Sequence, residues 1–339
     1  MQSKKHFLFY FLISLLCLSP FVESSEALKG DPSVDYFYTP FSSESSHSIP
    51  ATFTSSSSDT TAPGHLFIEP YLYLTSTFGN YDKNWKSHSQ TSFYSLNLQT
   101  YVWIGMTSFL DFWIAPQIFY QFTENQNSTQ FGDLPIGFDI QILNDTPASW
   151  HPSIELSIQA NMPLGKYNNL NQTKLSTDSV GTGSFLPSLS LSSSKLFFLS
   201  NNHYLEPRLS FNYSIPTSVS VQNLNTYGGV KGTKGTVFPG NIFICDLGFE
   251  YSLTLHWAIS CDIFYEHTNK TTFKGTPGPA TLGLPTVIGH PSSEQISIAP
   301  SLEYNLNSSM GFTGGFWISL FGRNSSRFAT GVLSFTIYI

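Results

Sequence analysis

Ser153-Ile154-Glu155-Leu156-Ser157-Ile158-Gln159-Ala160-Asn161 is the stretch that decides the fold. Apolar residues occupy every second position, and polar residues stand between them. Because successive side chains of a β-strand point to opposite faces of a sheet, this spacing predicts a strand with one apolar and one polar face. The same alternation recurs around Leu98, Phe138, Leu209 and Ile298. The sequence therefore predicts an all-β protein.

The composition favours a barrel in a membrane over a soluble β protein. Charged residues make up 11% of the chain and aromatic residues 16%, whereas a soluble domain has about 25% charged residues. The mean hydropathy is only -0.05, and no apolar run after His65 reaches the ~20 residues of a membrane helix. These properties are typical of strands that contact lipid on one face and water on the other.

About twelve alternating segments have the 9–11 residues that cross a bilayer at a tilt. Their centres lie near Tyr71, Gln99, Ala115, Phe138, Ser157, Ser188, Leu209, Leu247, Ser260, Ala299, Phe316 and Leu333. We therefore predict an antiparallel transmembrane β-barrel of about 12 strands over residues 65–339, located in a bacterial outer membrane.

The connections between these segments alternate in length. The odd-numbered connections centre near Tyr81, Asn127, Leu170, Lys231, Pro279 and Asn324. They are mostly long, above all residues 165–181, 216–240 and 268–292, with 323–326 as the expected short exception. The even-numbered ones, such as 105–107, are mostly short. Outer-membrane barrels have short periplasmic turns and longer external loops, so we expect both termini in the periplasm.

The N-terminus has the features of a secretory signal. Lys4 and Lys5 precede an apolar run from Phe7 to Leu18, which Pro20 ends. We predict a signal peptide over residues 1–24, cleaved after Ser24, with cleavage after Ala27 as the alternative. Residues 25–64 are rich in Ser, Thr and Pro and have little apolar area to bury, which predicts a flexible periplasmic segment.

The C-terminus ends in an alternating strand up to Ile339, where outer-membrane barrels usually carry a Phe that the barrel-assembly machinery reads. That machinery and the outer-membrane lipid are therefore expected partners. The net charge is -7, and no basic run exists beyond Lys4 and Lys5. Since nucleic-acid binding needs clustered Lys and Arg, nucleic acid is not an expected partner.

The inward phase of the alternation carries an acidic set of side chains. The predicted lumen-lining residues are Asp111, Asp139, Glu155, Glu206, Arg208, Asp246, Glu250, Asp262, Glu266 and Glu303, with Glu69 on the same face. Dry, unpaired carboxylates would cost several kcal/mol each. Either the lumen is wet, or loop lysines such as Lys231, Lys234 and Lys274 fold in to pair them. A wet acidic lumen favours cations or neutral solutes over anions.

The outward face is expected to carry aromatic girdles and two thiols. The candidate girdle residues are Trp103, Trp113, Tyr120, Trp257, Tyr265, Trp317 and Tyr338. Cys245 and Cys261 fall on the outward faces of consecutive strands. They could pair, but free thiols facing lipid are favoured because disulfides strain easily in β geometry.

Signals for catalysis are weak. No HExxH, CxxC or GxSxG spacing occurs, so no metal, cofactor or catalytic residue is predicted. Outer-membrane phospholipases place a His and a Ser on the lipid face of a twelve-stranded barrel. His256 with Ser260, or His203 with Ser210, are the candidates for such a pair.

Three short motifs carry a family resemblance. They are Phe131-Gly132-Asp133-Leu134-Pro135-Ile136-Gly137, then Met162-Pro163-Leu164-Gly165, then Gly181-Thr182-Gly183-Ser184-Phe185. This order resembles the outer-membrane proteins of the meta-pathway of phenol degradation family, although Met162 stands where Leu is usual. The resemblance implies a membrane β-barrel suspected of moving small hydrophobic or aromatic compounds, and it brings no catalytic motif.

Two functions of different classes follow. The first is a channel or transporter for small-molecule solutes, including hydrophobic or aromatic ones. The alternative is a surface-displayed barrel whose long outer loops act as an adhesin or antigen. An enzyme resembling the outer-membrane phospholipases is a distant third.

Overall fold

The computed structural model describes residues 60–146, 149–199, 203–279 and 286–339. The predicted signal peptide, residues 1–24, lies outside these residues, as does the segment 25–64 except for its last five residues. Within the described part, no helix has the length and hydropathy needed to cross a membrane.

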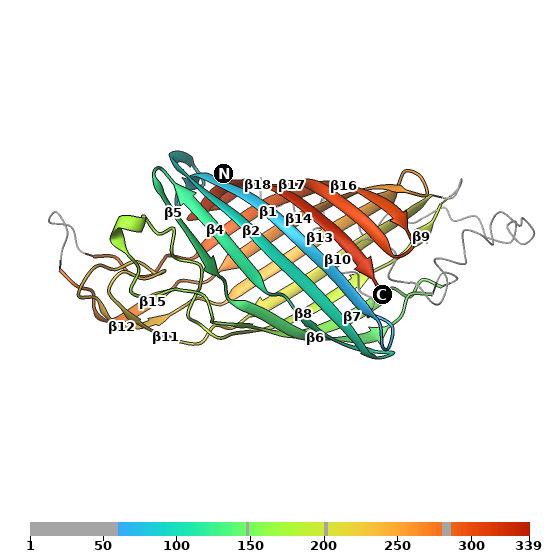
Figure 1. Cartoon of the computed structure of the whole chain (residues 1–339), viewed down its shortest axis with the longest axis horizontal. Helices are drawn as coiled ribbons and strands as arrows, with labels where there is room; N and C mark the ends of the chain where they lie inside the picture. The colour runs from blue at the N-terminus through green and yellow to red at the C-terminus, as the bar shows by residue number, and fades with distance from the viewer. Residues whose placement is uncertain (1–59, 147–148, 200–202, 280–285) are drawn as a thin grey trace, which may run out of the picture. The chain divides into compact units, whose positions relative to one another are not determined.

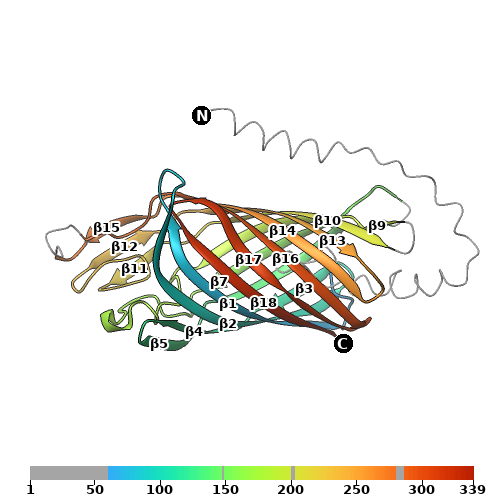
Figure 2. The ribbon, with the colours of Figure 1, turned by 90° about the horizontal axis from the view of Figure 1, so that it is seen from above.

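The described chain forms a closed antiparallel β-barrel with tilted strands (Figures 1 and 2). Its wall contains β1 (Leu66–Tyr81), β2 (Ser87–Thr107), β3 (Leu110–Ile114), β4 (Gln117–Thr123), β5 (Gln126–Phe131), β6 (Leu134–Leu143), β7 (Ser153–Met162), β8 (Leu186–Ser194), β9 (Phe197–Phe198), β10 (Tyr204–Ser214), β13 (Ile242–Ser252), β14 (Trp257–Thr268), β16 (Ser293–Asn307), β17 (Met310–Arg323) and β18 (Ser325–Tyr338). Successive strands pair antiparallel except at three interruptions, β3/β4, β5/β6 and β8/β9, and β1 closes the ring by pairing with both β2 and β18.

The wall has twelve strand positions around the ring. We call each position a stave, whether one long strand or two short strands in line form it. β3 and β4 follow one another along the same neighbour, β2. In the same way β6 pairs with β3 and β5 pairs with β4, so β5 and β6 follow one another along the stave that β3 and β4 form. β8 and β9 both pair with β10. Each of these pairs of short strands therefore counts as one stave. The prediction of an antiparallel barrel of about twelve strands is confirmed.

The side chains are distributed inside out relative to a soluble protein. Buried side chains of the described residues are mainly polar, while many Leu, Ile and Phe side chains are exposed. In β14, for example, Ile259 and Ile263 are exposed, whereas Ser260 and Asp262 are buried. The period-two alternation thus gives the barrel an apolar outer surface and a polar interior, as a lipid-facing wall requires.

The connections sort to two ends of the barrel. The long ones, residues 163–185, 215–241 and 269–292, lie at one end, called here the loop end. The other end, the turn end, holds short connections such as 108–109 and 308–309, and there Leu66 and Ile339 exchange two backbone hydrogen bonds of 2.9 Å. The expected sorting is confirmed for the three longest loops.

Two of the expected long connections are instead tight turns. The first odd-numbered connection is only residues 82–86. The second is only residues 124–125, and Asn127, expected at its centre, lies inside β5. Near the loop end both faces of these strands are polar, as in Ser87 to Gln90 of β2. Hydrophobic alternation therefore ends before the strand does, and the sequence underestimates strand length.

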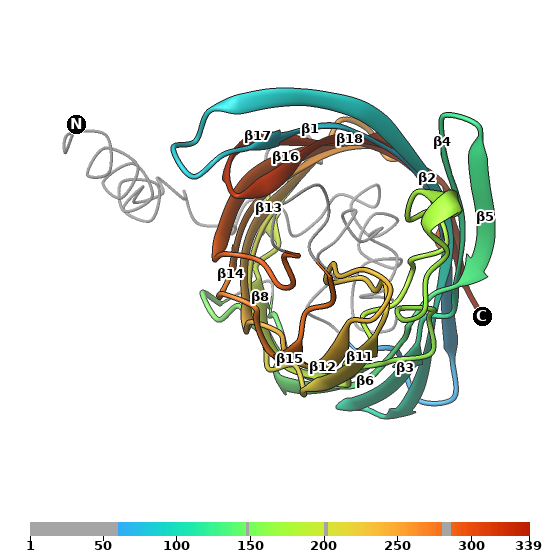
Figure 3. The ribbon, with the colours of Figure 1, turned by 90° about the vertical axis from the view of Figure 1, so that its left-hand side faces the viewer.

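Two of the long loops, residues 215–241 and 269–292, build a second, smaller sheet at the loop end. It consists of β11 (Val219–Gln222), β12 (Lys234–Phe238) and β15 (Thr272–Thr276), and Figure 3 looks onto it. Val219, Val221, Val237 and Tyr227 form its hydrophobic core. The loop 163–185, with the 3₁₀ turn η2 (Gln172–Lys174), binds to it through Leu170 N–H and Leu224 C=O, 2.9 Å apart. We call this sheet and loop the cap.

The wall is interrupted where β3 gives way to β4 and β5 to β6. Pro116 lies at the first break and has no N–H for the ladder, and Gly132-Asp133 lie at the second. A Cβ on Gly132 would stand 2.5 Å from the Phe119 ring, so any larger residue there would have to displace that ring. β5 pairs with β4 alone among the described strands, and the β4–β5 hairpin bows away from the ring in Figure 3.

Candidate functional site

A cavity of about 330 Å³ lies inside the barrel, and eleven of the barrel strands contribute side chains to it. Its lining comprises Glu69, Tyr71, Tyr101, Trp103, Trp113, Asp139, Ser157, Gln159, Ser190, Ser192, Ser210, Asn212, Ile244, Asp246, Phe264, Glu266, Gln295, Ser297 and Trp317. Aromatic and hydroxyl side chains dominate this lining, and they come from different parts of the wall.

Aromatic rings form one side of the cavity. Tyr101 and Trp103 of β2 stack with ring centroids 5.1 Å apart, and Phe264 and Trp317 meet at 5.5 Å. The prediction that Trp103, Trp113 and Trp317 form outer girdles is wrong, because all three line the cavity. Trp103 lies two residues after Tyr101 in β2, so the alternation predicts that both side chains point inward. The girdle assignment instead followed from the position of Trp103 near a strand end.

Asp139 holds two of these indoles in place. Trp103 Nε1 donates to its Oδ2 over 3.2 Å, and Trp113 Nε1 donates to its Oδ1 over 3.0 Å. Gly137 makes room for the second indole, since a Cβ there would lie 2.7 Å from the Trp113 ring. Hydrogen bonds to a carboxylate are stronger than those between neutral groups, so this carboxylate fixes the aromatic wall.

Serine side chains form the opposite side. Ser157 of β7 pairs in register with Ser190 of β8, and Ser192 pairs with Ser210 of β10. In the ring order, β10 and β8 lie about half a turn from β1 and β2. Small hydroxyl side chains leave the space that larger residues would fill. The cavity therefore has an aromatic face and a hydrogen-bonding face.

The predicted lumen carboxylates are on the inner side of the wall. Nine of the ten predicted residues are buried, namely Asp111, Asp139, Glu155, Glu206, Arg208, Asp246, Glu250, Asp262 and Glu303, and Glu266 is half-buried. Three of the ten, Asp139, Asp246 and Glu266, line the cavity together with Glu69. That these ten residues line a conducting path stays a prediction.

Arg208 is the centre of a buried charge cluster. Its Nη2 forms an ion pair with Glu250, whose other oxygen accepts from Tyr204 Oη over 2.7 Å. Glu206 stands opposite Glu250 in the ladder, and Asp262 is within electrostatic reach. A lone arginine among several carboxylates leaves this part of the interior acidic.

Loop lysines do not complete the pairing. Lys231, Lys234 and Lys274 are exposed in the cap, and none of them forms an ion pair within the described residues. Of the two alternatives, the one in which these lysines fold in is wrong, because β12 and β15 hold Lys234 and Lys274 at the loop end. The buried lysine is instead Lys195, paired with Asp145.

The residues just before β1 bind to the barrel interior at the turn end. Thr60 N–H donates to Gln141 Oε1 over 2.9 Å, and Thr61 N–H donates to the Asp111 carboxylate. Both threonines are buried. Ordered contacts therefore begin before His65, within the segment predicted to be flexible, and its polar sequence gave no sign of them.

The three motifs of the family resemblance meet at one side chain. Asp133 Oδ1 accepts from Gly165 N–H over 2.8 Å, and its Oδ2 accepts from the N–H and the hydroxyl of Thr182, each over 2.9 Å. Gly165 and Gly181 are so close that a Cβ on the latter would lie 2.4 Å from the former's carbonyl. We call this arrangement the Asp133 clamp; it joins both ends of the loop 163–185 to the wall break.

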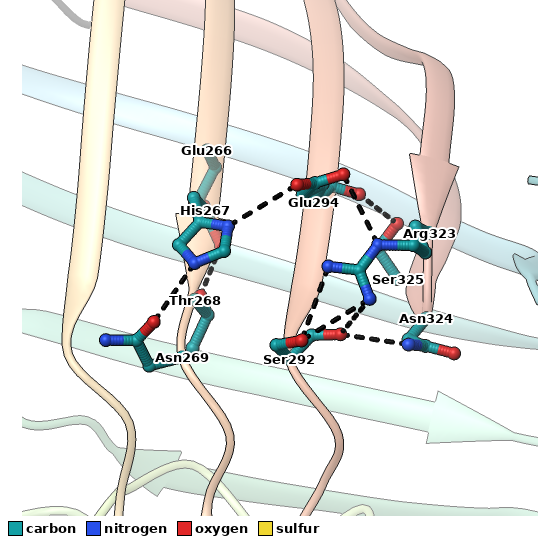
Figure 4. A network of polar contacts seen from close by, with 9 residues as sticks. All are labelled: Glu266, His267, Thr268, Asn269, Ser292, Glu294, Arg323, Asn324 and Ser325. Atoms are coloured by element: carbon teal, nitrogen blue, oxygen red, sulfur yellow. Dashed lines mark hydrogen bonds and ion pairs between the residues drawn. The ribbon is translucent and has the colours of Figure 1, made fainter. Parts of the chain in front are cut away.

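A second polar network reinforces the loop end on the outer side (Figure 4). Glu294 of β16 accepts from Arg323 Nε of β17 over 3.3 Å and lies 3.7 Å from His267 Nδ1 of β14. Arg323 also donates to Ser292 C=O over 3.1 Å. Glu294, Arg323 and His267 tie three staves together, and none of these three lines the cavity, although Glu266, drawn beside His267 in Figure 4, does.

The candidate lipid-face His–Ser pairs are not assembled. The His256 ring lies 2.7 Å from Asn305 C=O, while Ser260 is buried and bonded to Ser301. His203 Nδ1 lies 2.8 Å from Ser252 C=O. No group of three His, Cys, Asp or Glu in the described part could hold a metal ion. Cys245 and Cys261 are free thiols, as favoured above.

The fold has a counterpart among solved structures. The COG4313 outer membrane channel from Pseudomonas putida F1 matches with a TM-score of 0.63, covering 84% of this chain and 100% of that one at 11% identity. That likeness shows a shared fold. The NanC porin (TM-score 0.39, 10% identity, 78% and 98% covered) and the TodX deltaS2S3 mutant monoaromatic hydrocarbon channel (0.37, 12%, 81% and 91%) match too weakly to compare folds in detail. No family model and no curated protein matches the chain in sequence.

Proposed function

We propose that this chain is a channel or transporter of the bacterial outer membrane for small aromatic or hydrophobic solutes. The observation that carries the proposal is the cavity of about 330 Å³ inside a barrel whose outer surface is apolar. A cavity of ~150 Å³ already holds a benzene molecule, and ligand pockets begin at roughly 300 Å³. The interior thus has room for one substituted ring.

The lining suits such a solute. The stacked rings of Tyr101 and Trp103 offer a flat apolar surface, and aromatic pairs gain about 0.5–1.5 kcal/mol beyond area burial. The serines on the other side can bind a hydroxyl or amino substituent. A polar, water-filled pore for ions alone would have no need of an aromatic wall held by Asp139.

We also propose that the chain is a distant member of the outer-membrane proteins of the meta-pathway of phenol degradation family. The support is that the three motifs that resemble this family form one structural unit, the Asp133 clamp. Motifs that depend on one another in space are less expected to arise by chance than separate turns. Residues 1–24 are proposed as the signal peptide that would direct export.

Uptake into cells tests the proposed function. Ser190 lies at the centre of the serine face, and Leu189 beside it is 52% exposed on the outer surface. In a porin-deficient host, radiolabelled benzyl alcohol should enter faster when the chain is produced. S190W fills the cavity and should abolish the gain, whereas L189W adds the same side chain outside and should retain it. Equal uptake with and without the chain would refute the proposal.

The cap is the observation behind a second candidate, display of the long loops as an adhesin or antigen. Its own hydrophobic core of Val219, Val221, Val237 and Tyr227 makes it an independently packed surface. Display predicts that the assembled barrel binds a host or matrix ligand through the cap and conducts nothing. Retained uptake after exposed cap lysines are neutralised would favour transport over display.

A further inference from the structure

The charged side chains that line the cavity all have the same sign. Glu69, Asp139, Asp246 and Glu266 are in the lining, and no Lys or Arg of the described chain joins them. Arg208, which lies nearby, already pairs with Glu250. A solute in the cavity therefore meets carboxylates and ring faces but no cation.

Asp246 differs from the other three carboxylates in having no hydrogen-bond partner among the described residues. It is 3% exposed, and neither of its oxygens accepts a hydrogen bond from any described residue. By contrast, Asp139 accepts from two indoles, Glu69 from Ser334 and Glu266 from Thr268. A buried carboxylate without a partner costs several kcal/mol, so this position favours a positively charged guest.

The surroundings of Asp246 provide the second half of a cation site. Its register partners are Ser210 on one side and Phe264 on the other, and the Phe264 ring packs against Trp317. The next inward residue on β14, Asp262, adds a further negative charge within electrostatic reach, and Arg208, which is paired with Glu250, adds a smaller opposing one. A carboxylate beside aromatic faces is the combination that binds organic ammonium groups, through charge and through cation–π attraction.

We propose that the cavity selects small aromatic cations, with the ammonium group at Asp246 and the ring against the aromatic wall. This inference rests on the proposed function and names its solute class. Aromatic carboxylates are disfavoured, because the charged side chains of the lining are all acidic. A bare metal ion is disfavoured as well, since the described carboxylates form no cluster of metal-binding geometry.

Three probes that share one ring but differ in charge test the selection: benzylammonium, benzyl alcohol and benzoate. Trp103, Trp113 and Trp317 line the cavity, so quenching of tryptophan fluorescence in the refolded full chain reports binding there. We expect benzylammonium to bind at least about 10-fold more tightly than benzyl alcohol, a factor that corresponds to one modest charge interaction. Benzoate should bind most weakly, and the preference for benzylammonium should fall as salt is added.

The matched variants are D246N and E294Q. Both remove one carboxylate charge, but Glu294 lies in the outer network at the loop end. We expect D246N to reduce the preference for benzylammonium to within about 3-fold of benzyl alcohol, and E294Q to leave it unchanged. Heat-modifiable gel migration checks that each variant forms a barrel. If D246N does not fold, the wild-type comparison of the three probes and its salt dependence still decide the matter.

Failure of this inference can be distinguished from failure of the proposed function. If benzyl alcohol binds and enters cells as well as benzylammonium does, or if D246N folds and keeps the preference, the cation site is refuted while the channel stands. If none of the three probes quenches the fluorescence or enters faster than in cells lacking the chain, both are refuted.

Discussion

Replacing Asp133 with Ala should release the loop 163–185 from the barrel wall. The carboxylate accepts three hydrogen bonds, one from Gly165 N–H and two from Thr182. Asp133 is 3% exposed, and the bond to Gly165 is fully buried, so water cannot readily replace it. The clamp therefore joins both ends of the loop 163–185 to the wall through one buried carboxylate.

The expected cost can be worked out bond by bond. Leaving the buried Gly165 N–H without an acceptor costs about 1–3 kcal/mol, and each part-buried bond to Thr182 contributes about 0.5–1.5 kcal/mol. Since bonds to one side chain are not additive, we expect D133A to lower the free energy of unfolding by about 3 kcal/mol. T182V removes the hydroxyl bond to Asp133 and the longer hydroxyl contacts with Ser184, and it should cost about 1 kcal/mol. T182S keeps the hydroxyl and should cost little.

Urea unfolding of the refolded barrel, followed by tryptophan fluorescence, measures these differences. Trypsin cleavage at Lys166 and Lys174 reports release of the loop directly, and D133A should be cut faster than T182S. In the D133A background, T182V should cost less than in the wild type, because the bond to Asp133 is already gone and only the 3.3 Å contacts with Ser184 remain. A loss below about 0.5 kcal/mol in D133A with unchanged cleavage, or a full T182V effect in that background, would contradict the clamp.

Three further outcomes follow from the structure. R208M leaves Glu250 buried without its ion pair and should cost about 3–5 kcal/mol, while R208M/E250M should recover most of that loss in urea unfolding; equal losses in the single and double variants would refute the pairing. G137A brings a Cβ to 2.7 Å from an indole and should cost about 1–3 kcal/mol, whereas G331A, with nothing within 4 Å of its Cβ, should not; equal effects would show that the indole moves freely. The backbone N–H of Lys86, followed by the His88 ring, lowers the pKa of Asp82 in the β1–β2 turn from 3.8 to about 2. Because the folded pKa is depressed, the carboxylate supports the turn above pH 3.8 and loses this role as the pH falls through about 2; an NMR titration midpoint of the turn amides near 4 would contradict it.

The sequence predicted the barrel wall well because each stave has one face in an apolar environment. That environment forces the alternation seen in β7, and the same phase correctly places carboxylates such as Glu155 and Asp246 on the buried side. Prediction failed where that constraint ends. Near the loop end both faces of β2 and β5 are polar, so strand and loop residues look alike, and Asn127 was expected in a loop.

The cavity itself was harder to predict. Trp103 and Trp113 were assigned to outer girdles because aromatic residues at strand ends favour the membrane interface. Both positions share the inward phase of Tyr101 and Asp111, but neither strand alone predicts that the two indoles meet at Asp139, which is 26 residues or more away in the chain. Contacts of this kind depend on register between staves, which alternation within one stave does not specify. The cap was missed for the same reason, since its three short strands pair across long separations.

Conductance through a planar lipid bilayer tests most directly whether solutes pass through the barrel interior. Refolded wild-type protein should give discrete current steps, and L189W, altered on the outer surface, should give the same steps. S190W, which fills the cavity from the serine face, should reduce or abolish them. No current steps from correctly folded wild-type protein, or steps of equal size in all three proteins, would contradict a path through the cavity.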